Sequence, residues 1–141
     1  MPAKKKALAP RHRLLIVDDE ESMRLMLARH ASKGLKAEVQ LAGTCEQALR
    51  LARNYAYDAI LLDLMMPGIG GFGVLYWVRR SVPNAATPVI MVSVVSEHDA
   101  ITRCLAAGAN AYLVKPVKRA ELAKTVQDQL VTRGKNRTSL K

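Results

Sequence analysis

The hydrophobic pattern of this chain changes its period repeatedly between residues 14 and 131. Short unbroken apolar runs, typical of strands buried on both faces, alternate with stretches whose apolar residues recur at helical spacing. The expected strands are 14–17, 37–41, 59–62, 89–92 and 111–114, and the expected helices are 21–31, 45–54, 72–81, 99–107 and 118–131. Because right-handed strand-helix-strand units build parallel sheets, the pattern predicts an α/β fold, a doubly wound (βα)5 sheet in the order 2-1-3-4-5.

The net charge of +10 on 141 residues comes mainly from the two ends of the chain. Each end carries four basic residues and no acidic one, which leaves 14 basic and 12 acidic residues, a net of +2, between residues 13 and 130. The ends lack apolar periodicity, and such composition is typical of disorder. We therefore predict one folded domain over residues 13–131, with basic disordered tails over 1–12 and 132–141.

Several classes of function are disfavoured by composition. No apolar run approaches the 18 residues of a membrane-spanning helix and no secretion signal is apparent, so we expect a cytoplasmic protein without membrane insertion. The tails contain no aromatic residue for stacking on bases, so specific nucleic-acid binding is not expected. Cys45 and Cys104 are far apart and have no neighbouring metal-ligand pattern, which favours ordinary apolar packing.

Three acidic residues follow two of the predicted strands. Asp18 and Asp19 come directly after the first strand, and Asp63 follows the third. A sheet ordered 2-1-3 places the carboxyl ends of these strands side by side, at the crevice where such folds bind ligands. Adjacent carboxylates repel one another, and a hard divalent cation such as Mg²⁺ relieves that repulsion with oxygen ligands. The sequence therefore predicts a Mg²⁺ site at this edge of the sheet.

Two further side chains are expected at the same edge. Ser93 ends the fourth strand and Lys115 ends the fifth. Together with Mg²⁺ they supply what phosphoryl transfer requires: positive charge beside the phosphoryl oxygens, a hydroxyl donor and a carboxylate nucleophile.

Four sequence blocks at these strand ends match a known family. They are LLIVDDEESMR at 14–24, DAILLDLMMPG at 58–68, PVIMVS at 88–93 and AGANAYLVKP at 107–116. On these blocks the chain resembles the receiver domain of two-component system response regulators, of the single-domain type. The resemblance implies the flavodoxin-like strand order that the pattern predicts.

The resemblance also implies a role for each acidic residue. Asp63 would accept a phosphoryl group from a histidine kinase or a histidine phosphotransfer protein. Asp19 and Asp63 would bind Mg²⁺, or Mn²⁺, directly, Asp18 would assist through water, and the backbone carbonyl of Met65 would complete the metal site.

Further residues would sense the phosphoryl group. Lys115 would pair with its oxygens, and the Lys115–Pro116 bond is expected to be cis. Ser93 would move to bind it and Tyr112 would follow inward. The surface of the fourth helix, fifth strand and fifth helix would then change shape for a downstream protein partner or for dimerisation on phosphorylation.

Other interpretations stay open at this point. The chain could be the N-terminal receiver fragment of a longer multidomain regulator, or an interaction module that works without phosphorylation. Turnover of an external substrate is not expected, because aspartate-based phosphatases of the haloacid-dehalogenase-like family need a second acid where Met65 stands. Val94 departs from the small residue usual in receivers, which leaves the rate of phosphorylation open. Met65 and Val95 are apolar and offer no general base for hydrolysis of a phosphoryl group.

Overall fold

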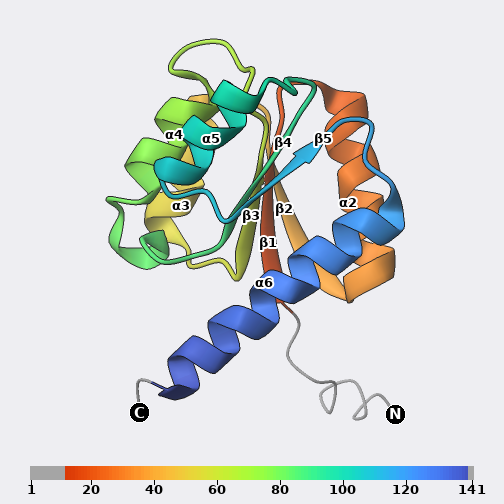
Figure 1. Cartoon of the computed structure of the whole chain (residues 1–141), viewed down its shortest axis with the longest axis vertical. Coiled ribbons are helices and arrows are strands. Elements are labelled where there is room, and N and C mark those ends of the chain that lie inside the picture. The colour runs from red at the N-terminus through yellow and green to blue at the C-terminus, as the bar shows by residue number, and fades with distance from the viewer. Residues whose placement is uncertain (1–11, 140–141) are drawn as a thin grey trace.

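The computed structural model describes residues 12–139, with side chains described for residues 12–133 (Figure 1). The predicted N-terminal tail lies outside the described residues except for His12, which begins the first strand. The strands are β1 His12–Val17, β2 Ala37–Ala42, β3 Ala59–Leu62, β4 Val89–Ser93 and β5 Ala111–Val114. The helices are α2 Glu21–Leu35, α3 Cys45–Asn54, α4 Gly70–Val78, α5 His98–Ala106 and α6 Arg119–Ser139, with a short 3₁₀ helix, η1, at Val82–Asn84.

All five strands form one parallel sheet in the order β2-β1-β3-β4-β5, which confirms the predicted fold class. Helices α2 and α6 cover one face, and α3, α4 and α5 cover the other (Figure 1). Alternate residues along β1 point to opposite faces, so Leu14 and Ile16 belong to the core under α2 and α6, while Leu15 and Val17 belong to the other core. The sheet is thus buried on both sides, as the unbroken apolar strands require.

Two helices run further than predicted. Helix α2 continues past the expected end at residue 31 because Ala31 and Leu35 are both buried, and its left-handed cap is Lys36. Gly34 lies inside this helix, where a Cβ would stand 3.2 Å from the Cβ of Ala123 on α6. The small residue therefore permits a close crossing of α2 and α6.

The predicted disordered tail over residues 132–141 is wrong for residues 132–139, which continue helix α6. This stretch contains no proline, and Arg133 joins the helix to the loop before β3. Its Nη1 donates to the carbonyl oxygens of Tyr57 at 3.0 Å and Asp58 at 3.3 Å. Within the described residues, no helix is long and apolar enough to cross a membrane.

Arg79, at the end of α4, joins three segments at the amino ends of β4 and β5. Its Nε and Nη2 donate to the carbonyl oxygen of Gly108 at 3.1 and 2.7 Å, and Nη2 also reaches Asn110 Oδ1 at 2.9 Å. Its Nη1 donates to the carbonyl of Thr87 at 2.8 Å. Burial lowers the pKa of Arg79, and neutral oxygen acceptors surround the guanidinium. Arg79 therefore joins the end of α4 to the segments that precede β4 and β5.

Candidate functional site

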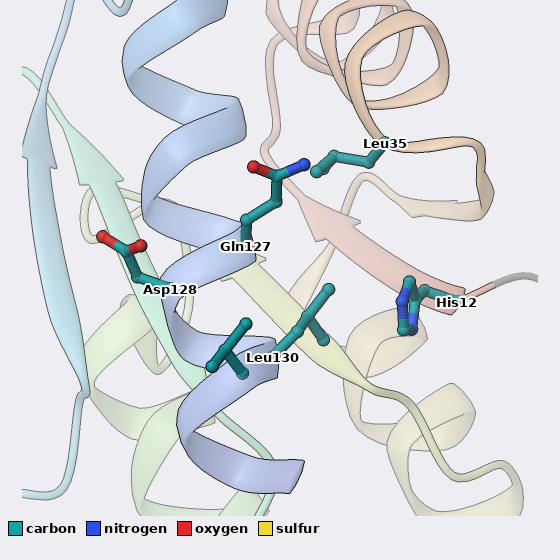
Figure 2. A pocket seen from close by; sticks show the side chains of 6 residues that line it. His12, Leu35, Gln127, Asp128 and Leu130 are labelled. Atoms are coloured by element: carbon teal, nitrogen blue, oxygen red, sulfur yellow. The ribbon is translucent and has the colours of Figure 1, made fainter. Parts of the chain in front are cut away.

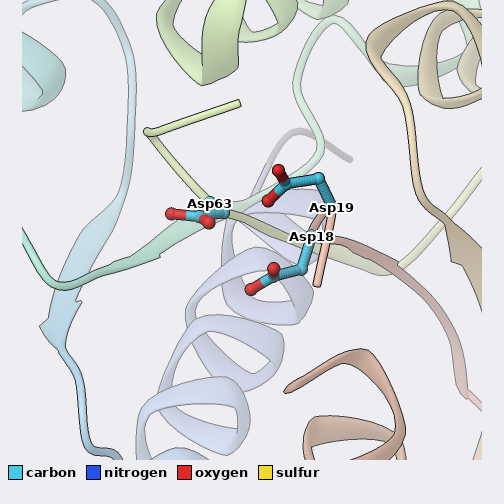
Figure 3. A group of neighbouring side chains, drawn as sticks. All are labelled: Asp18, Asp19 and Asp63. Carbon is cyan, nitrogen blue, oxygen red and sulfur yellow. The ribbon is translucent and has the colours of Figure 1, made fainter. Parts of the chain in front are cut away.

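The three acids predicted from the sequence meet at the carboxyl ends of β1 and β3. Figure 3 shows Asp18 and Asp19 extending from the end of β1 and Asp63 from the end of β3. One carboxylate oxygen of each lies within 4.8 Å of the others. Asp18 and Asp63 are buried, with exposed fractions of 1% and 6%, whereas Asp19 is exposed. The site is thus an acidic group with one side open to solvent.

Lys115 lies between the two buried acids. Its Nζ is 2.7 Å from Asp18 Oδ2 and 3.4 Å from Asp63 Oδ2. The other oxygen of Asp18 accepts the backbone N–H of Glu20 at 2.9 Å, and Asp63 Oδ1 accepts that of Met65 at 3.2 Å. The Lys115–Pro116 peptide bond is cis. The ammonium is therefore bonded more closely to Asp18 than to Asp63.

Burial and neighbouring charges shift the pKa values of Asp63 and Lys115. Burial raises the pKa of Asp63 and the charge of Asp18 adds to that rise, while the ammonium of Lys115 opposes it. Burial alone would lower the pKa of Lys115, but its hydrogen bond to Asp18 and the charges of both acids outweigh burial, so that pKa is raised. The fold thus disfavours the negative charge of Asp63, and a bound cation would offset that charge.

Ser93 and Tyr112 both contact the loop between β4 and α5. Ser93 is fully buried, and its Oγ accepts the backbone N–H of Val95 at 3.2 Å. The hydroxyl of Tyr112 donates to the carbonyl oxygen of Val95 at 2.6 Å. The two residues that the family resemblance assigns to the switch thus hold the same residue, one through its N–H and the other through its carbonyl oxygen.

The donor set fits a hard divalent cation. Octahedral Mg²⁺ binds oxygen at about 2.1 Å, so oxygens that share one ion lie about 3 to 4 Å apart, close to the spacing of the three carboxylates. Asp18 has both oxygens engaged by Lys115 and Glu20, which suits an indirect role. Direct ligation by Asp19 and Asp63, and the part of the Met65 carbonyl, stay predictions.

Sequence reasoning missed three residues that build this site. Arg24 Nη1 donates to the carbonyl oxygen of Asp18 at 2.8 Å and so fixes the turn after β1. Val95 contributes its backbone N–H and carbonyl oxygen, which other residue types also carry, so the sequence does not indicate its role. Gly71 allows α4 to approach the Asp63 backbone: a Cβ there would stand 2.0 Å from the Asp63 carbonyl oxygen. This glycine lies just before the predicted helix 72–81, so its close approach to the strand end left no signal in the sequence.

A separate hollow lies at the opposite end of the sheet, between the start of β1, the end of α2 and α6 (Figure 2). His12, Leu35 and Leu130 are among the residues that line it. Its remaining lining residues are Gln127, Asp128 and Val131. A single carboxylate and a single imidazole among apolar side chains do not form a metal site or a nucleophilic pair, so the acidic end of the sheet is the candidate site.

The family model for the response regulator receiver domain matches residues 14–127, which include every residue of the acidic site. The chain belongs to the response regulator receiver domain family. This receiver domain is therefore a component of two-component signalling, and it keeps all four sequence blocks at the strand ends where its fold gathers them.

Known proteins resemble this receiver domain in sequence and in structure. It is 36% identical over 122 residues to the sensory/regulatory protein RpfC of Xanthomonas campestris pv. campestris, covering 85% of this chain and 17% of RpfC. A CheY-like receiver domain protein from Methanospirillum hungatei JF-1 superposes with a TM-score of 0.84 at 25% identity, over 90% of this chain and 99% of that one.

A second structural relative was solved with a metal. The receiver domain of sensor histidine kinase PA1611 from Pseudomonas aeruginosa PAO1, described with a magnesium ion coordinated in its active site cleft, has a TM-score of 0.79 at 29% identity. The alignment covers 86% of this chain and 98% of that domain. The chain thus spans whole receiver domains but less than a fifth of the length of RpfC.

Proposed function

We propose that this receiver domain accepts a phosphoryl group on Asp63 from a phosphohistidine of a histidine kinase or histidine phosphotransfer protein. The observation that carries the proposal is the geometry around Asp63. Its buried carboxylate lies beside the ammonium of Lys115 and belongs to a group of three acids that suits Mg²⁺, in a chain of the receiver family. A carboxylate is a competent nucleophile, and the surrounding cations offset charge on the transferred group.

In the proposed reaction a carboxylate oxygen of Asp63 attacks phosphorus. An oxygen–phosphorus bond forms while the phosphorus–nitrogen bond of the donor breaks, and the departing imidazole takes up a proton. Bound Mg²⁺ supplies positive charge beside the phosphoryl oxygens. Asp19 and Asp63 hold that cation directly, and Asp18, fixed by the Glu20 amide, orients Lys115 toward the incoming oxygens.

The output of the proposed reaction is a change of shape. A phosphoryl group on Asp63 draws the hydroxyl of Ser93 toward it, which weakens the bond between Ser93 Oγ and the Val95 N–H. Because Tyr112 holds the same residue, the loop before α5 and the surface of α5, β5 and α6 respond together. A downstream protein partner would recognise that surface. The domain promotes its own phosphorylation and dephosphorylation, without turnover of an external substrate.

Incubation with Mg²⁺ and acetyl phosphate, followed by intact mass measurement, tests this function. The wild type is expected to gain one phosphoryl group, and Asp63→Asn none, because the amide is not a nucleophile of this kind. Asp128→Asn, a change of the same type on an exposed part of α6, is the matched control and should gain the group. An adduct on Asp63→Asn, or on neither protein, contradicts the assignment and favours a module that works without phosphorylation.

A further inference from the structure

The outer face of helix α4 presents an apolar surface that the acidic site does not use. This α4 face consists of Ile69, Gly73, Tyr76, Trp77 and Arg80, which share one side of the helix at spacings of three, four and seven residues. Ile69, Tyr76 and Trp77 are 50%, 45% and 47% exposed. The opposite side of the helix, with Val74 and Val78 among its residues, packs into the core.

Helix α4 is apolar on its outer side as well as on its buried side. Its nine residues, Gly70–Val78, include no charged side chain. A helix that is apolar all round is normally covered on every side, and a contiguous exposed patch of this kind is typical of an interaction site. Gly73 shapes the surface, because a Cβ there would stand 2.7 Å from the Cβ of Ile69, whose side chain lies over the glycine.

The aromatic side chains of the α4 face are held in place by neighbours. The Tyr76 and Trp77 rings meet edge to face, with centroids 5.2 Å apart and planes at 85°. The guanidinium carbon of Arg80 lies 3.7 Å from the centroid of the Tyr76 ring, and Arg80 Nη1 donates to the Tyr76 carbonyl at 3.0 Å. Trp, Tyr and Arg are the residues enriched at the energetic centres of protein interfaces, and ordered side chains lose little entropy on binding.

The α4 face carries the positive charge of Arg80 and no negative charge. No acidic residue occurs in the sequence between Asp63 and Glu97, so α4 and the segments beside it in the chain supply no carboxylate. Among the described residues, no carboxylate lies within 4.0 Å of the Arg80 guanidinium. Two copies meeting by this face would bring arginine against arginine, in a protein of net charge +10. The face therefore suits a partner that brings negative charge.

We propose that the α4 face docks an amphipathic helix of another protein, one with an apolar stripe for Ile69, Tyr76 and Trp77 and a carboxylate for Arg80. A helix laid on a helix buries apolar side chains at spacings of three and four residues, which matches the spacing of this face. The surface is separate from the α5, β5 and α6 surface of the proposed switch, so docking here does not depend on a phosphoryl group on Asp63.

Trp77 is the only tryptophan of the chain, so its fluorescence reports directly on the proposed surface. The full chain is titrated with a synthetic amphipathic helical peptide that carries leucines at helical spacing and flanking glutamates. Two further peptides replace the glutamates by lysine or scramble the leucine positions. The glutamate peptide is expected to bind and to shift the Trp77 emission to shorter wavelength, and the other two peptides are not.

Charge reversal distinguishes docking at this face from general attraction to a basic protein. Arg80→Glu should weaken binding of the glutamate peptide at least about tenfold and make the lysine peptide the better ligand. Arg29→Glu, on helix α2 at the other face of the sheet, changes net charge equally and should leave the preference unchanged. Thermal melts followed by circular dichroism identify any variant that fails to fold. Because Trp77→Phe removes the fluorophore, its binding is measured by the fluorescence anisotropy of a labelled peptide.

Three results would overturn the proposal. The first is equal weakening by Arg29→Glu and Arg80→Glu, which would show attraction to net charge alone. The second is tighter binding of a labelled single-stranded oligonucleotide than of the glutamate peptide at 150 mM salt, lost in Trp77→Ala, which would make the face a base-stacking surface. The third is concentration-dependent self-association abolished by Trp77→Ala, which would make the occupant a second copy.

Discussion

At the scale of single residues, Asp63 is the acid whose ionised form the fold disfavours. Burial raises its pKa, and the nearby charge of Asp18 raises it further against the opposing ammonium of Lys115. The folded chain therefore protonates Asp63 at a higher pH than the unfolded chain does. Ionised Asp63 thus reduces the stability of the fold, and this penalty appears as the pH rises from the unfolded pKa through the raised folded value.

Replacing this carboxylate by its neutral isostere should stabilise the metal-free protein. At pH 7 without divalent cations, we expect Asp63→Asn to raise the free energy of unfolding by about 1 kcal/mol. The gain should shrink as the pH falls toward 4, because the wild-type carboxyl then carries a proton as well. Denaturant unfolding at several pH values, without Mg²⁺, measures this difference. The control Asp128→Asn should not gain stability. If Asp63→Asn were less stable than the wild type at pH 7, the attraction between Asp63 and Lys115 would exceed the penalty of burying the Asp63 charge.

Met65 bears on how long a phosphoryl group would remain on Asp63. Its backbone N–H reaches Asp63 Oδ1 at 3.2 Å, and its side chain is 60% exposed and unable to orient a water for attack. We expect Met65→Asn to accelerate loss of the phosphoryl group several-fold, because an amide can hydrogen-bond the attacking water. Intact mass followed over time after removal of acetyl phosphate gives the rate. Met65→Leu should decay like the wild type, and equal rates in all three proteins would contradict the idea.

At the scale of elements, Gly71 sets the distance between α4 and the site. A Cβ at this position would stand 2.0 Å from the carbonyl oxygen of Asp63 and 2.7 Å from the Cα of Leu64, so the backbone itself would have to move. We expect Gly71→Ala to lower the free energy of unfolding by about 2 to 4 kcal/mol. Gly73→Ala is the matched control in the same helix. Its new methyl would stand 2.7 Å from the Cβ of Ile69, so that residue must shift, but the methyl meets no backbone atom of the site, and the loss of stability should be smaller than that of Gly71→Ala.

The strands were predictable because burial on both faces leaves an unmistakable pattern of unbroken apolar residues. Strands β3 and β5 begin and end where predicted, and β1, β2 and β4 differ by two residues or fewer. Helix ends were less predictable because packing decides them. Gly34 is a residue type that often ends a helix, yet the buried residues Ala31 and Leu35 carry α2 past it. Helix α6 extends to Ser139 with the help of Arg133, whose carbonyl acceptors are distant in the sequence.

The acidic site was predictable for a related reason. Asp18, Asp19 and Asp63 come directly after strands, so the strand order alone brings them together. Lys115 was predicted beside them, but several other contacts that orient the site could not be predicted, because they are made by backbone groups. The amides of Glu20 and Met65 and both polar atoms of the Val95 backbone hold the site, and any residue type carries such groups.

At the scale of the whole molecule, Mg²⁺ should stabilise the entire fold. A cation that binds only the folded chain raises its stability by mass action, by about 2.7 kcal/mol at a concentration 100 times its dissociation constant. We expect the midpoint temperature of unfolding to rise with added MgCl₂ and to return to its original value after chelation with EDTA. Asp19→Asn should reduce the shift, because that acid is exposed and available to the ion. An equal shift from NaCl at matched ionic strength would instead indicate general screening.

The two ends of helix α5 are held by different side chains. Gly108, just beyond its C-terminus, receives two hydrogen bonds from the Arg79 guanidinium, which is itself fixed to Thr87 and Asn110. Beyond the N-terminus, the loop depends on the two bonds that Ser93 and Tyr112 make with Val95. We therefore expect a phosphoryl group that draws Ser93 away from Val95 to displace α5 most in the turn beginning at His98, and least at its C-terminal end beside Gly108.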